Sequence, residues 1–452
     1  MKTYQDLLKL GESEKERMDF IASAVAEHKN SEIYKTARIA ELYAKHMNVT
    51  INQYQKLLYT LSGKAVPDNY SANHKCASNF FDRFITQQNQ YLLGNGVTFE
   101  KEETKKKLGR NFDAKMQKAG KAALVGGVSF CFWNFDRIEV FKITELVPIY
   151  DEENGTMSAA IRFWQIDETK PMRYVLYEID GYTKYIKRRD EEMQIYEKKR
   201  EYHEIVRESK ADGIEISNGG SYPGFPIIPL WANDYHQSEL VGMREQIDCY
   251  DLIKSGFAND LDEASLFYWT LENCGGMKPE DIAKFVHQIK TLHAANVDGD
   301  EGAKATAHTM DVPYEGRETY LTRLENDMYN DFMALNVAQI AAGKITATQI
   351  NAAYEPLNEK TDQFEYQVTE CIHGILSVAG IDDDEPKYKR SKIVNQMEET
   401  EMVMMASSVL DDETILKKLP WLTPEEVAEV MERKTAEDGE KFFTETGGGD
   451  DI

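Results

Sequence analysis

The stretch LVGMREQIDCYDLIKSGFANDLDEA, residues 240–264, decides the architecture, because it carries an apolar residue at every third or fourth position. That spacing gathers the apolar side chains on one face of an α-helix, and about 30 helical residues reach roughly 45 Å. The apolar positions are Leu240, Met243, Ile247, Tyr250, Ile253, Phe257, Leu261 and Ala264. An ordinary buried helix would show the same pattern, but the length favours a stem or spine.

Beyond this helix the sequence alternates short elements with helical patterns. The glycines of CGG at 274–276 end the long helix, and a short helix is predicted over 279–292. A hairpin is predicted over 292–310, turning at residues 298–300 (DGD). A further amphipathic helix runs from 315 to about 335.

The last third of the chain contains a second long helical pattern. Residues 337–345 (VAQIAAGKI) are mostly small, and a capping box at Thr346 starts the next helix. Pro356 lies inside that helix and should kink it. Two more helices are predicted near 412–419 and from Thr423 onward, before a glycine-rich end that should be disordered.

The sequence before residue 240 indicates an α+β region. Residues 1–62 have loose helical spacing, and further helices are predicted over 72–93 and 104–124. Segments rich in β-branched and aromatic residues then predict an antiparallel meander. These segments are 128–135, 138–143, 159–165, 174–179 and 182–187.

The composition argues against several classes of protein. The formal net charge is −25, whereas a surface that grips nucleic acid needs clustered lysines and arginines. A conduit stays possible, because a wall that repels phosphate lets DNA slide, although acidity that serves solubility alone is the simpler interpretation. No apolar run approaches the ~20 residues of a membrane span, and the N-terminus lacks the apolar stretch of a signal peptide. The five cysteines are scattered, which is typical of reduced packing residues.

The sequence contains no Walker A, GxSxG, HExxH or kinase signature. His287 and His293 are six residues apart, so they do not share one helical face in adjacent turns. The turn at 297–302 lacks the alternating ligands of a calcium loop. We therefore predict no catalytic residue, no metal and no cofactor.

Five short segments follow one another at characteristic spacing. They are NQYLLGNGVTF (89–99), LVPIYD (146–151), PIIPLWAN (226–233), QIDCYD (246–251) with Ser255 and Asn259-Asp260, and YEPLNEK (354–360). In this order they are similar to segments of the portal proteins of tailed bacteriophages, in the siphophage family typified by a Bacillus phage portal. Gly96 stands where that family often has proline, and Thr361 departs from its pattern. Together the segments span residues 70–380, which is most of the chain.

The resemblance implies an α+β portal fold with an α/β wing, a two-helix stem, a small α/β clip, a long kinked spine helix and a helical crown. The implied ranges are 1–235 for the N-terminal part of the wing, 236–271 and 314–335 for the stem helices, 272–313 for the clip, 336–346 for the tunnel loop, 347–395 for the spine helix and a wing strand, and 396–452 for the crown and a disordered tail. The implied stem-helix residues are Ile247, Tyr250, Phe257, Leu261, Leu324 and Met328.

The resemblance also implies the partners. The chain would form a closed ring of about twelve copies at one capsid vertex, after assembly in the host cytoplasm. Double-stranded DNA would pass through the ring without sequence-specific contacts during packaging and ejection. The large terminase subunit, a head-completion adaptor, the scaffold and the major capsid protein would dock on it. No enzymatic activity and no membrane are implied.

The implied tunnel loop contains Ala341, Ala342, Gly343, Lys344 and Thr346 as the residues that face DNA. Small and pliable residues suit a loop that meets a moving duplex without reading its bases. Lys344 is the one charge in the loop and would form a sparse positive ring. A solvated loop lysine explains Lys344 equally well.

Two other hypotheses stay open. An unrecognised cytosolic enzyme or ligand-binding protein would use the 97–230 region, form a monomer or small oligomer, and have a dominant apolar pocket. Asp167 and Glu178 are the clearest titratable candidates in that region. A different virion scaffold or adaptor protein would lack the paired stem helices.

Overall fold

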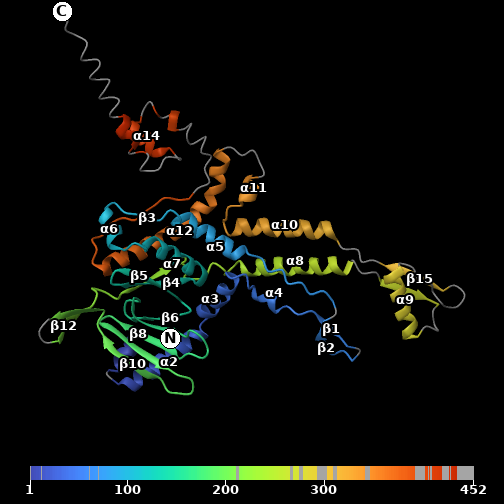
Figure 1. The fold of residues 1–452 in the computed structure, drawn as a ribbon, viewed down its shortest axis with the longest axis horizontal. Coiled ribbons are helices and arrows are strands. Elements are labelled where there is room, and N and C mark those ends of the chain that lie inside the picture. Colours follow the sequence, from blue (N-terminus) through green and yellow to red (C-terminus); the bar gives the residue numbers. More distant parts are fainter. Residues whose placement is uncertain are drawn as a thin grey trace, which may run out of the picture. The chain divides into compact units, whose positions relative to one another are not determined.

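Helices and antiparallel sheets alternate along the chain in a computed structural model (Figure 1). The chain divides into two compact units, Met1–Ala334 with Lys360–Lys389 and Leu335–Glu359 with Arg390–Ile452. The structure describes residues 2–11, 13–60, 62–69, 71–209, 213–264, 268–273, 278–292, 303–308, 313–341, 347–391, 403–405, 407, 410–419, 427 and 429–434.

The predicted N-terminal helices are confirmed as far as residue 53, as α1 Tyr4–Lys9, α2 Glu14–Asn30, α3 Glu32–Tyr43 and α4 Val49–Gln53. The predicted continuation to residue 62 is wrong. Strands β1 Leu57–Tyr59 and β2 Ala65–Pro67 pair there as an antiparallel hairpin. Gly63, with φ of +77°, supplies the left-handed turn residue that the hairpin needs.

Two further helix predictions need correction. Helix α5 spans Phe80–Leu93, so it begins eight residues after the predicted start at residue 72. The single helix predicted over 104–124 is two, α6 Glu102–Lys107 and α7 Phe112–Gly126. Gly109 separates them with φ of +90°, and a Cβ there would lie 2.7 Å from the Asp136 carbonyl oxygen.

The predicted antiparallel meander is confirmed. The strands are β4 Val128–Asn134, β5 Arg137–Lys142, β6 Leu146–Tyr150, β7 Met157–Trp164, β8 Met172–Glu178, β9 Gly181–Lys187, β10 Gln194–Arg200, β11 His203–Ser209, β12 Gly213–Gly220 and β13 Ile227–Trp231. One sheet has the order β10-β9-β8-β7-β6 and a second has the order β13-β4-β5, while β11 pairs with β12. The sequence interpretation missed β6, β10, β11, β12 and β13 as strands.

The helix predicted from residues 240–264 is confirmed, although its expected extent of 236–271 is too long. Helix α8 is Arg244–Ala264, and residues from Tyr268 onward belong to strand β14, Tyr268–Glu272. Helix α9, Pro279–Leu292, is as predicted. Strand β15, Lys304–His308, pairs with β14. The first arm and the turn of the hairpin predicted over 292–310 cannot be compared with the structure. Residues 293–302 lie outside the described part of the chain.

Helix α10, Tyr314–Asp331, runs antiparallel to α8 (Figure 1). Gln246 near the start of α8 donates a hydrogen bond to Asp331 at the end of α10. Asp260 near the end of α8 forms an ion pair with Arg317 near the start of α10. The predicted end of α10, residue 335, lies four residues beyond its observed end at Asp331.

The second long helix is confirmed as α12, Ala347–Ala379, with Pro356 inside it. The expected tunnel loop, 336–346, begins instead with a short helix, α11 Val337–Ala341. In the tail, α14 is Asp412–Lys418, capped by the Asp411 side chain. Residues 420–426 and 435–452, which include the predicted Thr423 helix start and the glycine-rich end, lie outside the described residues.

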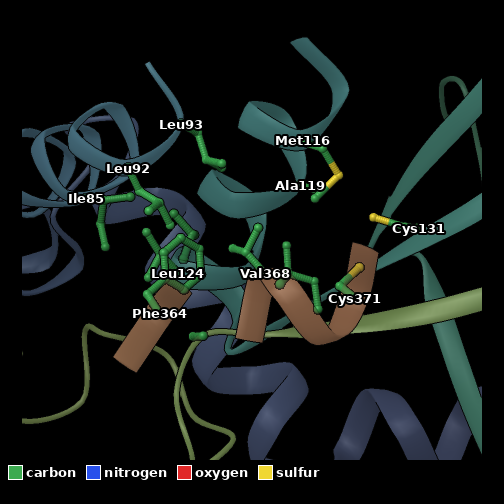
Figure 2. Packing of buried hydrophobic residues seen from close by; sticks show 14 of the residues in the cluster. Ile85, Leu92, Leu93, Met116, Ala119, Leu124, Cys131, Phe364, Val368 and Cys371 are labelled. Atoms are coloured by element: carbon green, nitrogen blue, oxygen red, sulfur yellow. The ribbon is translucent and has the colours of Figure 1, made fainter. Parts of the chain in front are cut away.

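The largest buried cluster joins α5, α7 and the second half of α12 (Figure 2). Phe364, Val368 and Cys371 extend from α12 into this cluster. Gly120 of α7 permits the close approach, because a Cβ there would lie 2.3 Å from Asn89 Oδ1 and 3.3 Å from Phe364. Strand β16, Lys387–Tyr388, then pairs with β3, Val97–Thr98, and ties the end of this segment to α5.

Candidate functional site

A ladder of three polar side chains on α8 holds an extended segment, residues 74–78, which we call the strap. Each ladder residue accepts a hydrogen bond from a strap backbone N–H. The pairs are Asp251 Oδ1 with Ser78 N at 2.9 Å, Ser255 Oγ with Cys76 N at 2.9 Å, and Asn259 Oδ1 with His74 N at 2.6 Å.

The ladder works because two backbone repeats nearly match. Four residues of α-helix rise about 6 Å, and two residues of extended chain advance about 6.6 Å. Acceptors at every fourth helix position therefore meet every second N–H of the strap, which runs antiparallel to α8. This regular pairing explains why residues 74–78 do not join α5 as the sequence had indicated.

Asp251 stands at one end of the ladder and is fully buried. Its Oδ2 accepts a second hydrogen bond from Asn48 Nδ2 at 2.5 Å. Burial raises the pKa of Asp251, whereas the hydrogen bonds from Asn48 and Ser78 act in the opposite direction. A carboxylate saturated by donors from its own chain is a structural group that fixes α4 and the strap on α8.

One turn earlier on α8, Asp248 makes a parallel set of contacts. It accepts hydrogen bonds from the Tyr43 hydroxyl and from Thr50 Oγ1, the latter at 2.6 Å. Arg244 lies 3.6 Å from the same carboxylate. Asp248 and Asp251 thus connect the N-terminal helices to α8 over nearly two hundred residues of sequence.

The other faces of α8 meet α5 and α10. Tyr250 packs edge-on against Phe80 with ring centroids 5.0 Å apart, and Phe257 packs edge-on against Tyr314 at 5.9 Å. Ile247 and Met328 are fully buried in the main cluster, whereas Leu324 is half-buried and Leu261 is exposed. All six predicted stem-helix residues lie on α8 or α10.

The predicted tunnel residues are less well described. Ala341 ends α11, and Ala342, Gly343, Lys344 and Thr346 lie outside the described residues. Their contact with DNA stays a prediction.

The lysine of the 354–360 segment has a role that the sequence did not indicate. Lys360 Nζ lies 2.8 Å from Glu239 Oε2 and 3.2 Å from the centroid of the Phe332 ring. Burial lowers the pKa of Lys360, and the Glu239 carboxylate partly offsets that effect. The ion pair and the cation–π contact fasten α12 to the end of α10.

The two titratable candidates of the 97–230 region have structural partners. Glu178 is buried and forms ion pairs with Arg17 at 3.2 Å and Lys199 at 3.1 Å, so it fastens α2 to the sheet. Asp167 is exposed and accepts hydrogen bonds within its own turn, from the amide and the hydroxyl of Thr169. Neither carboxylate has a pattern of contacts that suggests acid–base chemistry.

An apolar cleft of about 680 Å³ lies between β13 and β6, and Tyr150, Trp231 and His236 are among its lining residues. The Trp231 and His236 rings stack with centroids 3.8 Å apart. Burial raises the pKa of Tyr150 to about 12, so its hydroxyl stays protonated at neutral pH. Within the described ranges, no three His, Cys, Asp or Glu side chains cluster as metal ligands would. No helix in the same ranges is long and apolar enough to cross a membrane.

The sequence matches one known family over most of its length. The family described as "Phage portal protein, SPP1 Gp6-like" matches residues 27–441. A portal protein of Clostridium phage phiCD119 is 23% identical over 393 residues, covering 80% of this chain and 84% of the relative. The portal protein of Bacillus phage SPP1 is 21% identical over 443 residues, covering 89% of this chain and 85% of the relative.

Among solved structures, the fold is similar to a chain from a structure described as "Neck of native GTA particle computed with C12 symmetry". The TM-score is 0.44 and the sequence identity is 10%, over 76% of this chain and 90% of that chain.

Proposed function

Because the chain belongs to the phage portal protein family, we propose that it closes into a ring at one capsid vertex and that DNA enters and leaves the capsid through this ring. The resemblance predicted from the five sequence segments is confirmed. The protein is a portal protein, a structural component of a bacteriophage particle. The proposal concerns how this chain performs that role.

The braced helix pair supports the proposal most directly. Helices α8 and α10 pack antiparallel, and the strap and α4 are hydrogen-bonded along α8. A ring needs heterologous contacts that repeat from copy to copy, and long rigid helices can supply such contacts around an axis. We assign α8 and α10 to the stem, and the β14, α9 and β15 elements between them to the clip.

The charge of the helix pair fits a passage for DNA. Helices α8 and α10 together contain eleven acidic and four basic residues. A wall of this sign repels phosphate, so a duplex would slide along it without sequence-specific binding. The clip would meet the terminase and later the head-completion adaptor, while the wing (residues 1–235), the spine helix α12 and the crown (396–452) would meet the scaffold and capsid proteins.

Light scattering and negative-stain imaging of the purified chain test the proposal. We expect annular particles with a mass of about twelve subunits. A second preparation carrying Leu261→Pro, which breaks α8 in its last turn, should lose the ring because proline removes a helical hydrogen bond. A stable dimer or tetramer at high concentration would refute the ring and favour a binding function in the apolar cleft. A ring unaffected by the proline would favour a different scaffold or adaptor role.

A further inference from the structure

The β1–β2 hairpin has large apolar side chains that its own chain leaves uncovered. Leu57, Leu58 and Tyr59 are 49%, 40% and 75% exposed. Among the described strands, β1 and β2 pair only with each other (Figure 1). Alternating strand residues point to opposite faces, so exposure at all three positions means that both faces of the ribbon are open.

A two-stranded ribbon of this kind is marginally stable in water by itself. Its base, however, is firmly attached. Lys56 Nζ lies 2.7 Å from Glu263 Oε1 at the end of α8, and the amide of Asp68 donates to the Lys56 carbonyl oxygen at 2.8 Å. The strap then continues along α8 from residue 74 to 78. The hairpin is therefore held at a fixed site while its apolar strands remain available.

The hairpin and the helix pair have complementary charge and chemistry. Residues 54–67 contain two lysines and no acidic residue, whereas α8 and α10 contain eleven acidic and four basic residues. The helix pair also exposes large apolar side chains. These are Leu261 at 45%, Tyr314 at 49% and Tyr320 at 46%.

We propose that the β1–β2 hairpin packs on the α8–α10 face of a neighbouring copy of this chain. The inference rests on the proposed ring, in which each copy must present two different, complementary surfaces. The hairpin supplies one surface, with apolar residues at its centre and Lys64 near its turn. The exposed residues of the neighbour's α8 and α10 supply the other, with the exposed Glu315 and Glu318 close to Tyr314 on α10.

Cysteine pairing tests the contact directly. The double variant Tyr59→Cys with Tyr314→Cys, and the corresponding single variants, are oxidised mildly after assembly and separated under denaturing conditions without reductant. We expect a ladder of covalent multimers in the double variant only, because each link joins one copy to the next. The single variants control for the native cysteines, of which Cys76 and Cys249 are half-buried.

A second set of variants measures the contribution of the contact. Leu57→Ser with Tyr59→Ser should raise the protein concentration needed for half-assembly at least tenfold. Lys64→Glu should also raise that concentration, and by more at low salt than at high salt, because salt screens charges. Tyr196→Ser, at a residue 58% exposed on β10, is the matched control and should leave assembly unchanged. Circular dichroism checks that each variant keeps its secondary structure.

The outcomes separate this inference from the proposed function. If the unmodified chain forms rings but the double variant gives no ladder and the serine variants assemble normally, the hairpin contact is refuted and the portal ring stands. If the unmodified chain forms no ring at any concentration, the proposed ring fails and the hairpin has no neighbour to bind. A ladder in assembled rings, together with weaker assembly of the serine variants, supports the contact.

Discussion

Replacement of Asp251 by alanine should loosen the strap and destabilise the whole N-terminal unit. The variant leaves two buried donors, Asn48 Nδ2 and the Ser78 amide, without the acceptor that lies 2.5 Å and 2.9 Å from them. Each buried donor left without a partner costs about 1–3 kcal/mol, so the free energy of unfolding should fall by about 2–6 kcal/mol. Among alanine variants of the three ladder residues, Asp251→Ala should lose the most stability, because Asp251 alone accepts hydrogen bonds both from the strap and from Asn48 at the start of α4.

Hydrogen exchange followed by mass spectrometry measures the local effect. Peptides covering residues 74–78 should exchange faster in Asp251→Ala, because the Ser78 amide loses its acceptor, whereas peptides from the β7–β8 pair should be unchanged. Urea unfolding measures the global effect. Asp262→Ala is the control, since Asp262 lies on the same helix with its side chain 60% exposed and pairs with the His74 ring.

The control should lower the free energy of unfolding by less than about 1 kcal/mol, as exposed ion pairs do. Equal destabilisation by the two alanine variants would refute the ladder as the feature that holds the strap. Unchanged exchange over residues 74–78 in Asp251→Ala would refute it as well.

Three further predictions follow from the packing of α12 and α7. Lys360→Met should change the pH dependence of stability. Burial lowers the pKa of Lys360 in the folded protein below its usual 10.5. Between the folded-state pKa and 10.5 the unfolded chain binds more protons than the native protein, so the native protein gains stability as pH rises. The variant should lack this gain in urea unfolding between the lowered pKa and pH 10.5, and an equal gain in both proteins would contradict the assignment. Gly120→Ala should lower the free energy of unfolding by about 1–3 kcal/mol through the clash with Asn89. Gly256 on α8 has open space around it, so Gly256→Ala should raise the free energy of unfolding by up to about 1 kcal/mol. Thermal unfolding tests both, because the melting temperature should fall for the first variant and rise for the second. Phe364→Ala should cost about 3–5 kcal/mol, and a loss below 1 kcal/mol would show that its fully buried ring is not closely packed.

Local sequence patterns predicted the elements whose apolar residues have a clear helical or strand period. The meander strands, α8, α10 and α12 all have clear periodicity, and their existence and type are confirmed. The bounds were less accurate. The family resemblance implied a stem helix as far as residue 271, yet Tyr268–Glu272 pairs with a strand more than thirty residues later.

The errors at residues 57–79 have a common physical cause. The segment 72–79 contains small and polar residues that are compatible with a helix, but its backbone donors are taken by α8 side chains nearly 180 residues away. The helical spacing of residues 1–62 predicted helix for the hairpin before it, which is likewise held by a distant contact, between Lys56 and Glu263 of α8. One signal was available: Asp251, Ser255 and Asn259 lie at four-residue intervals on a helix whose neighbouring face is apolar. Such a row of acceptors indicates a backbone partner.

The sequence located residues of the candidate site but did not predict which contacts they make. The segment 246–251 with Ser255 and Asn259 was recognised as a family resemblance. Its members Asp248, Asp251, Ser255 and Asn259 hold the N-terminal helices and the strap on α8, whereas Gln246 bonds to Asp331 of α10. Lys360 was likewise predicted only as a match to the family segment, and the structure shows that it fastens α12 to α10. Resemblance located these residues because it reflects long-range contacts that periodicity cannot detect.

Helix α8 connects the strap, α4, α5 and α10. One face is bonded to the strap and α4, a second packs on α5, and a third packs on α10. An isolated helix of this length in water would be only marginally stable, so its rigidity must come from these contacts. In the last turns, Asn259 holds the strap, Asp260 pairs with Arg317 and Glu263 pairs with Lys56, whereas Leu261 is exposed. A helix braced in this way, with Leu261 open to solvent, is suited to pass a load from the strap and α4 to a neighbouring copy of the chain. The same residues therefore test the hairpin contact and the proposed stem.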